Sequence, residues 1–402
     1  TNTESSGRYH TDWLNMMYPR LRLARNLLTD DGVIFISIDD NEVDNLKKIC
    51  NEVFGEDNFV ATIIWKRKRG RDNSARWFSK AHEYLLLYAK SKEVFNVNFL
   101  ELDDETKKAY KNPDNDPRGN WRMLGCWARG TQGGVKYDFT TKDGQYFSER
   151  LWLFSKENLA KLDKENKLVI RGDNIYRKMF ITENKGRIPE TLWDNVSNAA
   201  NASDEIKRLF NEKIVFDTSK PIPYIMEMLK TASDKDSIVL DFFSGSSTTA
   251  HAVMQLNAED GGNRKFIMVQ LPEPTDEKSE AYKAGYMNIC EIGKERIRRA
   301  GEKIKEENKD KENIENLDTG FKVLKLDTSN IRKWQPDYDN LEQSLLDYVD
   351  NYMEGRTELD VVYEIMLKYG LDLTYPVDEF TLAQKKVYSI GFGMLMICLD
   401  NE

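Results

Sequence analysis

One stretch of the sequence, residues 236–256, restricts the possible folds of this chain more than any other. It reads DSIVLDFFSGSSTTAHAVMQL: an apolar run, a turn of small residues around Gly245, and a segment with apolar residues at helical spacing. A strand, a glycine-containing turn and a helix in this order form a cradle for a nucleotide-like cofactor. The turn lets a ligand approach the backbone, and the N–H groups of the first helical turn attract anions. The pattern predicts an α/β domain, but many α/β folds turn tightly here, so by itself it leaves the ligand open.

Composition narrows the class of protein. The net charge of −9 argues against a protein that coats DNA, although an acidic protein can still hold DNA in one basic channel. The chain has no run of 18 apolar residues and no signal-peptide pattern, which predicts a cytoplasmic protein with no membrane partner. Four widely spaced cysteines and three histidines predict neither a disulfide framework nor a metal site. The chain starts at Thr1 without a methionine and ends just after the apolar run 393–399, so we expect truncation at both ends.

The order of patterns predicts several domains. Helical spacing over 11–28, the apolar run 33–38, a second helix after Asp39, and strands at 59–65 and 84–88 indicate a doubly wound α/β domain. The run 33–38 is typical of a strand buried on both faces of a parallel sheet. We therefore expect a first α/β region over residues 1–91, an aromatic-rich insert over 92–213, a second α/β region that carries the cradle over 214–301, a charged linker over 302–319, and a small α+β domain over 320–402.

A second motif precedes the cradle. Phe216, Lys220 and Pro221 form F-x-x-x-K-P, a helix pattern follows, and then comes D-F-F-x-G-S-x-T-T from Asp241. This combination resembles motifs X and I of the β-class amino-methyltransferases of DNA, which use S-adenosylmethionine. In that class the cofactor half follows the catalytic half, which accounts for the late position of the cradle.

Longer stretches resemble the modification (Mod) subunits of type III restriction-modification systems. They are distributed along nearly the whole chain, at 5–42, 82–92, 112–119, 185–193, 257–273 and 354–377. The resemblance implies a Rossmann-like methyltransferase sheet, an inserted target-recognition domain, and methyl transfer from S-adenosylmethionine to N6 of an adenine flipped out of double-stranded DNA. It also implies a homodimer and a Res helicase-nuclease partner. A solitary methyltransferase acting on adenine N6 or cytosine N4, and a catalytically silent DNA-recognition protein of the same fold, stay open.

The resemblance assigns site residues by position. The cofactor-binding set is Phe216, Thr218, Lys220, Pro221, Asp241, Phe242, Phe243, Ser244, Gly245, Ser246, Thr248, Thr249 and Gln270. Two positions depart from the family pattern. Ser247 stands where a second glycine is frequent, and Gln270 stands where related enzymes place an acid for the ribose hydroxyls. An amide oxygen accepts a weaker hydrogen bond than a carboxylate does.

Two further groups complete the expected site. His82, Glu83 and Tyr84 match the motif that borders the target-base pocket, although a strand start with a capping histidine explains them equally well. A basic cluster follows the strand that ends at Trp65, and we expect it to contact DNA phosphates instead of being only a solvated loop. Its members are Lys66, Arg67, Lys68, Arg69, Arg71 and Arg76.

The catalytic tetrapeptide of the family, D-P-P-Y, is missing. In the family it offers a side-chain oxygen and a main-chain carbonyl to the target amine, and its tyrosine stacks on the flipped base. The ten prolines of this chain include no Pro-Pro pair. We therefore assign no catalytic residue and expect the tetrapeptide to lie upstream of Thr1.

This absence generates a first prediction. The purified 402-residue chain should transfer no methyl group to DNA, because none of its residues can polarise the target amine as D-P-P-Y does. Incorporation of tritium from methyl-labelled S-adenosylmethionine into duplex DNA measures this directly. Labelling of adenine above the protein-free background would show that the catalytic groups lie within these residues.

Overall fold

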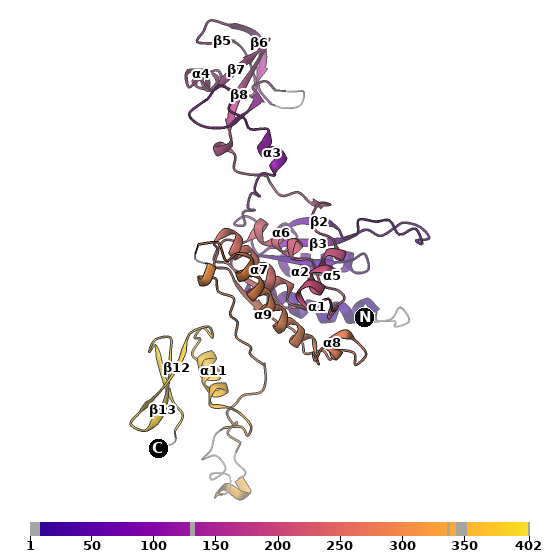
Figure 1. The fold of residues 1–402 in the computed structure, drawn as a ribbon, viewed down its shortest axis with the longest axis vertical. Coiled ribbons are helices and arrows are strands. Elements are labelled where there is room, and N and C mark those ends of the chain that lie inside the picture. The colour runs from indigo at the N-terminus through magenta and orange to yellow at the C-terminus, as the bar shows by residue number, and fades with distance from the viewer. Residues whose placement is uncertain (1–8, 129–132, 313, 336–337, 343–351, 401–402) are drawn as a thin grey trace. The chain divides into compact units, whose positions relative to one another are not determined.

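A computed structural model describes residues 9–128, 133–312, 314–335, 338–342 and 352–400 (Figure 1). The chain divides into two compact units, residues 1–319 and 320–402, at the boundary that the sequence predicts for the C-terminal domain. Within the described ranges, no helix is both long enough and apolar enough to cross a membrane.

The first region of the larger unit is a sheet covered by two helices. Its elements are α1 (Tyr9–Leu27), β1 (Val33–Ile38), α2 (Val43–Phe54), β2 (Phe59–Lys66) and β3 (His82–Ala89). Helices α1 and α2 pack their apolar faces against one face of the sheet, around Leu21, Leu46 and Tyr88, all of them buried. Helix α1 covers most of the range 11–28 in which the sequence shows helical spacing, and Asp12 lies in its first turn.

The pairing of β1 differs from the parallel arrangement that we expected. The strands run in the order β1-β3-β2-β9, and β3 is antiparallel to both β1 and β2. All six residues of β1 are partly exposed, so β1 is not buried on both faces. An uninterrupted apolar run indicates a largely covered strand, but it does not identify the partner strand or its direction.

The insert leaves and re-enters the larger unit at a narrow neck. Leu100 and Arg187 exchange two backbone hydrogen bonds of 2.8 Å, and the Asn98 N–H donates to Thr231 O at 2.8 Å. A Cβ on Gly186, whose φ is +109°, would lie 2.4 Å from Leu100 O, so this side of the neck needs glycine. The chain then returns to the first sheet, where β9 (Leu192–Trp193) pairs in parallel with β2.

The boundary predicted at residue 213 is therefore too late. Trp193 packs with Trp65 and Tyr224, and helix α5 (Ala199–Leu209) packs through Ile206 against Ile292. The aromatic-rich composition continues past the point at which the chain rejoins the main sheet. Composition alone therefore does not reveal that point.

The insert itself is built from two small sheets and two short helices. One sheet has the order β4-β8-β7 and the other pairs β5 with β6. The elements are α3 (Asp104–Lys108), β4 (Trp121–Gly125), β5 (Val135–Thr140), β6 (Tyr146–Trp152), α4 (Lys156–Lys164), β7 (Leu168–Arg171) and β8 (Asn174–Phe180). Trp152 and Leu159 are fully buried in its apolar core.

A buried ion network fixes the loop 112–119 of the insert. The ammonium of Lys178, which is only 6% exposed, contacts Asp114 and lies 2.7 Å from Asp116. Arg118 donates two hydrogen bonds to Asp116, at 2.8 and 2.7 Å, and these hold the pKa of Asp116 well below its ordinary value. Trp121 Nε1 donates to Asp114 at 2.9 Å. The charged side chains of the loop thus find their partners within the insert.

The last region of the larger unit carries the cradle. Its elements are α6 (Ile222–Ala232), β10 (Ile238–Asp241), α7 (Thr248–Asp260), β11 (Lys265–Met268), α8 (Glu280–Lys283) and α9 (Ile289–Glu307). Strands β10 and β11 are parallel, and α7 packs against both α6 and α9 (Figure 1). Ala252, Val253 and Leu256 of α7 are buried, as their helical spacing predicted. Among the described residues, β10 and β1 each pair along one edge only.

The smaller unit has an α+β fold, as predicted. Helix α11 (Glu358–Lys368) packs on the antiparallel sheet of β12 (Val377–Leu382), β13 (Lys385–Ile390) and β14 (Leu395–Cys398). Thr357 and Asp360 form a capping box at the start of α11. The apolar run near the C-terminus is thus a strand of this sheet.

The ion network of the insert yields a stability prediction. Lys178→Met should lower the free energy of unfolding of the insert by about 3 kcal/mol, because it removes the buried cation that the carboxylates of Asp114 and Asp116 share. Chemical unfolding followed by circular dichroism, with limited proteolysis of the insert, measures the loss. Lys185→Met changes a lysine outside this network and serves as the control. Equal stability of the two variants would contradict a stabilising role of the network.

Candidate functional site

The turn between β10 and α7 is held by the carboxylate of Asp241. Asp241 accepts hydrogen bonds from Phe243 N at 3.1 Å and from Thr249 Oγ1 at 2.6 Å. These two bonds tie the end of the strand to the start of the helix. Asp241 therefore fixes the shape of the turn, which explains an acid directly after the apolar run.

Gly245 lies at the centre of the turn with φ +50°. A Cβ at this position would lie 3.3 Å from Cζ of Phe216, so the ring of Phe216 covers the glycine. The F-x-x-x-K-P segment and the small-residue turn are adjacent in space, as the resemblance implied. Gln270, at the end of the neighbouring strand, accepts a hydrogen bond from Gly245 N through Oε1 at 2.7 Å. This contact connects all three predicted cofactor segments.

A buried arginine lies on the opposite side of the turn. Nη1 of Arg296, in α9, lies 2.7–2.8 Å from the hydroxyls of Ser219, Ser246 and Thr248. Arg296 is 1% exposed, and burial lowers its pKa to about 10. A guanidinium in such a place needs these acceptors, and the hydroxyls hold the F-x-x-x-K-P segment to the turn.

Ser247 completes the turn in a conformation that favours glycine. Its φ of 61° and ψ of 39° are left-handed, which explains why the family pattern often has glycine here. A Cβ on Gly293 of α9 would lie 2.6 Å from Ser247 Oγ. The glycine in α9 thus leaves room for the serine in the turn.

The side chains predicted to bind the cofactor point in different directions. Ser246 and Thr248 are buried, and their hydroxyls face Arg296, whereas the Thr249 hydroxyl is bound to Asp241. Ser244 and Pro221 are buried as well. The remaining members are partly or fully exposed, and they are Phe216, Thr218, Lys220, Asp241, Phe242, Phe243, Gly245 and Gln270. This second set is open to a ligand, whereas the N–H groups of Phe243, Ser244, Gly245 and Ser247 in the turn already have acceptors.

Glu83 joins residues that the sequence assigned to three separate roles. One of its oxygens contacts the ammonium of Lys220, and the other accepts a hydrogen bond from Arg67 at 2.6 Å. Only 14% of the Glu83 side chain is exposed. Lys220 also lies over the ring of Trp65, 5.1 Å from its centroid. The cofactor motif, the base-pocket motif and the basic cluster therefore meet at one carboxylate.

The strand alternation of β3 divides the predicted base pocket. Glu83 shares the sheet face with Leu85 and Trp65, and His82 and Tyr84 lie on the opposite face. The rings of His82 and Tyr84 meet edge to face, with centroids 5.1 Å apart. Tyr84 and Lys80 lower the pKa of Asp40 by hydrogen bonding, although burial opposes the shift. The contiguous motif suggested a single pocket, but these three residues do not form one.

The residues predicted to contact phosphates also fall into two groups. Arg67 is used by Glu83, and its Nε is buried without a hydrogen-bond partner. The other members, Lys66, Lys68, Arg69, Arg71 and Arg76, are exposed, and none has an ion-pair partner in the parts of the chain that the structure describes. These five side chains are available to a polyanion, and Arg67 is not.

Arg296 is the residue that sequence reasoning missed. It stands in the apolar stripe of α9, between Ile292 and Ile297, where a charged residue is a signal of a buried partner. His251 also lies buried near Arg296. Burial lowers its pKa to about 3, and the charge of Arg296 acts in the same direction.

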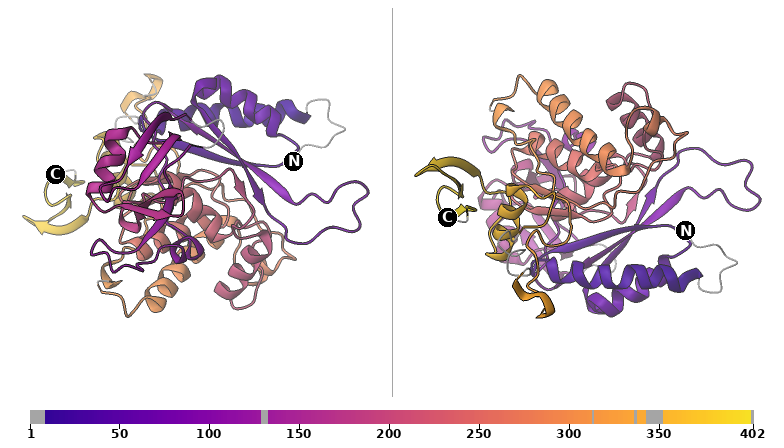
Figure 2. Two further views of the ribbon diagram at one scale, coloured as in Figure 1. Left: turned by 90° about the horizontal axis from the view of Figure 1, so that it is seen from above. Right: turned by 90° about the horizontal axis from the view of Figure 1, so that it is seen from below.

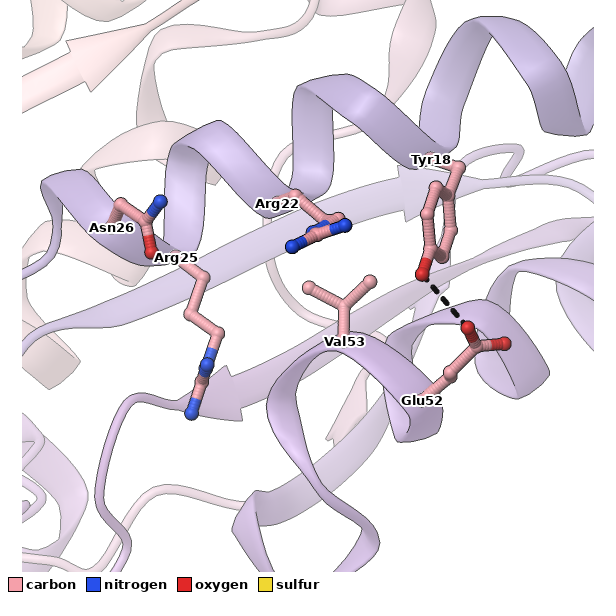
Figure 3. A pocket seen from close by; sticks show the side chains of 6 residues that line it. All are labelled: Tyr18, Arg22, Arg25, Asn26, Glu52 and Val53. Atoms are coloured by element: carbon pink, nitrogen blue, oxygen red, sulfur yellow. Dashed lines mark hydrogen bonds between the residues drawn. The ribbon is translucent and has the colours of Figure 1, made fainter.

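A separate pocket lies between α1 and α2 (Figure 3). It is lined by Tyr18, Arg22, Arg25, Asn26, Glu52 and Val53, and Tyr18 OH donates to Glu52 at 2.8 Å. None of these residues belongs to the predicted cofactor, base or phosphate sets. The pocket is therefore distinct from the candidate site.

Comparisons with known proteins agree with the geometry. Residues 2–302 match the sequence family described as DNA methylase. The chain is 42% identical to the type III restriction-modification enzyme StyLTI Mod subunit of Salmonella typhimurium, over 79% of this chain and 49% of that protein. It is 29% identical to the EcoP15I Mod subunit of Escherichia coli, over 99% and 65%. It is 33% identical to the type II methyltransferase M.KpnI of Klebsiella pneumoniae, over 70% and 72%. The chain spans about half the length of the first of these relatives.

The contact between α9 and the turn yields a double-mutant prediction. Gly293→Ala alone should destabilise the chain, because the new Cβ would lie 2.6 Å from Ser247 Oγ. In the Ser247→Gly background the same change should stabilise it by up to about 1 kcal/mol, since alanine is the better helix former. Urea unfolding of the four proteins measures the coupling. Additive effects would show that Ser247 does not contact this face of α9.

Proposed function

Because the chain belongs to the DNA methylase family, we propose that it binds S-adenosylmethionine and double-stranded DNA as part of a type III Mod subunit. The reaction of that subunit is the transfer of a methyl group to N6 of adenine. A DNA substrate in the cell places the protein in the cytoplasm. The observation that carries the proposal is the convergence of the cofactor turn, the F-x-x-x-K-P segment and the basic cluster around Gly245 and Glu83.

The open side of the turn fits S-adenosylmethionine. Gly245 lets a ligand approach the backbone below the ring of Phe216, and Phe243 is 53% exposed beside it. The first N–H groups of α7 have no intrahelical acceptors and suit a carboxylate. Gln270, already bound to Gly245 N, holds the turn next to the position expected for the ribose. Bound there, the cofactor would supply an electrophilic methyl group.

Lys220 has a different role in the site from the one that the motif implied. Its ammonium is paired with Glu83, so it does not present a free charge to the cofactor carboxylate. The pair instead fixes the start of β3 against the segment that precedes α6. Lys220 is thus a positioning residue that keeps the cofactor turn and the predicted base-pocket strand together.

The DNA side of the proposal rests on the exposed cations that follow β2. Lys66, Lys68 and Arg69 lie close in sequence to Arg67, whose partner Glu83 also binds Lys220. Phosphates held by these cations would therefore lie near the cofactor turn. We propose that the groups that polarise the target amine lie outside these 402 residues, since the D-P-P-Y tetrapeptide of the family is missing from them.

The type III assignment is supported by the extent of the similarity. The EcoP15I alignment takes in nearly the whole chain, including the smaller unit 320–402, whereas the M.KpnI alignment covers less of it. A Mod homodimer and a Res helicase-nuclease partner follow from this assignment. Co-purification with a helicase-nuclease of the same operon tests the partner, and light scattering tests the dimer.

A solitary methyltransferase is the second candidate, because M.KpnI matches over most of its own length. The two candidates differ in the partner and not in the cofactor site. Nucleoside analysis of methylated DNA separates adenine N6 from cytosine N4 as the target. A silent DNA-recognition protein would bind DNA with no affinity for S-adenosylmethionine.

Gly245→Asp should abolish binding of S-adenosylmethionine. The new side chain would enter the turn beside Phe216, where the carboxylate of the cofactor is expected, and two negative charges would repel each other. Isothermal titration calorimetry measures the affinity. Gly261→Asp is a matched control, since Gly261 also has a positive φ but has open space around its Cβ position. Unchanged affinity in a folded Gly245→Asp variant would contradict the assigned site.

A further inference from the structure

The loop between β2 and β3, residues 67–81, has a defined shape and is here called the arm. Figure 2 shows it as a long loop that extends beyond the ends of its two strands. Its base is closed by a hydrogen bond from Lys68 N to Ala81 O of 3.2 Å. Its middle is a turn in which Asp72 accepts two hydrogen bonds from Ser74, at 3.0 and 2.6 Å, and Asp72 N donates to Ser79 at 2.7 Å.

Two aromatic side chains stand in water on the arm. Trp77 is 80% exposed and Phe78 is 90% exposed, although both follow a hydrogen-bonded turn. Large aromatic rings gain the most free energy from burial, so two adjacent rings left in water indicate a surface that another molecule covers. The described structure of this chain provides no such cover.

The charge on the arm selects the class of that molecule. Lys68, Arg69, Arg71 and Arg76 are exposed, without an ion-pair partner among the described residues. The one acid of the arm, Asp72, is engaged by Ser74, which lowers its pKa. The guanidinium of Arg76 lies 4.9 Å from the ring centroid of Trp77. Unneutralised cations thus stand directly beside the exposed rings.

Nucleic acid combines what these two features require. Each nucleotide carries a planar, largely apolar base and a negative phosphate a short distance apart. Proteins that bind nucleic acids use aromatic rings to stack on bases and neighbouring cations to contact the backbone. Apolar side chains can also enter a duplex between base steps. A protein partner would have to supply both an apolar surface and a dense set of acids.

We propose that Trp77 and Phe78 stack on bases of the DNA duplex, as a wedge placed by phosphate contacts of Lys68, Arg69 and Arg71. This deepens the proposed function and rests on its DNA-binding part. The arm is rooted at Arg67, next to the Glu83–Lys220 junction, so the wedge acts at the edge of the cofactor site. Unstacking the duplex there would ease the extraction of a base, since flipping requires the loss of stacking.

The test separates stacking from phosphate contact by the dependence on salt. Trp77→Ala/Phe78→Ala should weaken binding to duplex DNA by roughly 5- to 100-fold per ring, with an unchanged slope of log K against log salt. Lys68→Ala/Arg69→Ala/Arg71→Ala should instead reduce that slope by about 0.9 for each phosphate that is no longer neutralised. Trp77→Phe/Phe78→Tyr keeps two rings and should retain the affinity. Titrations of the purified protein at several salt concentrations provide these values, with circular dichroism to verify the fold.

A second readout reports on the bases themselves. 2-Aminopurine placed along the duplex becomes brighter where it loses its stacked neighbours, and the increase should vanish in Trp77→Ala/Phe78→Ala. Unchanged DNA affinity of this variant, or a loss that appears only as a reduced salt slope, would overturn the wedge. A fall in oligomer mass with unchanged DNA affinity would overturn it too, in favour of a protein contact. If the unaltered protein binds no DNA, the proposed function itself fails, whereas failure of the wedge proposal alone leaves the proposed cofactor and DNA binding of the unaltered protein in place.

Discussion

The guanidinium of Arg296 is the contact on which the candidate site depends. Three hydroxyls from two separate segments share its Nη1 within 2.8 Å, in a place with almost no access to water. Separating these segments would leave Nη1 of a buried cation without acceptors, at a large cost in free energy. Arg296 thus ties the F-x-x-x-K-P segment and the turn to α9, while Asp241 holds the shape of the turn itself.

Glu83 has a comparable role on the other side of the site. It is paired with two cations, one from the segment before α6 and one from the root of the arm, and its side chain is mostly buried. Removing one cation would leave a single ion pair and would break the link between the two segments. The proposed cofactor site and the proposed DNA site therefore share a group, although no residue of the chain needs to contact both ligands.

The sequence predicted the local elements of the site better than the contacts between them. The strand, turn and helix from Ile238 to Leu256 are confirmed, because their apolar spacing and small residues are local signals. The parallel pairing that we expected for β1 was wrong, since an apolar run carries no information on strand direction. His82, Glu83 and Tyr84 are consecutive, yet the two-residue period of a strand places Glu83 on the opposite face. Arg296 was overlooked because its partners lie some fifty to eighty positions earlier in the chain, where no spacing rule reaches.

The neck at Leu100 and Arg187 affects how the insert can change in evolution. Once two backbone hydrogen bonds join the ends of the insert, the closure entropy grows only slowly with the length above them, by about 0.6 kcal/mol per doubling. The insert also keeps its own apolar core and its own internal ion network. Its size and surface can therefore drift, or be exchanged as a module, without disturbing the sheet from which it leaves. Gly186 is the position at which such an exchange would first be felt, because any side chain there would push the ends apart.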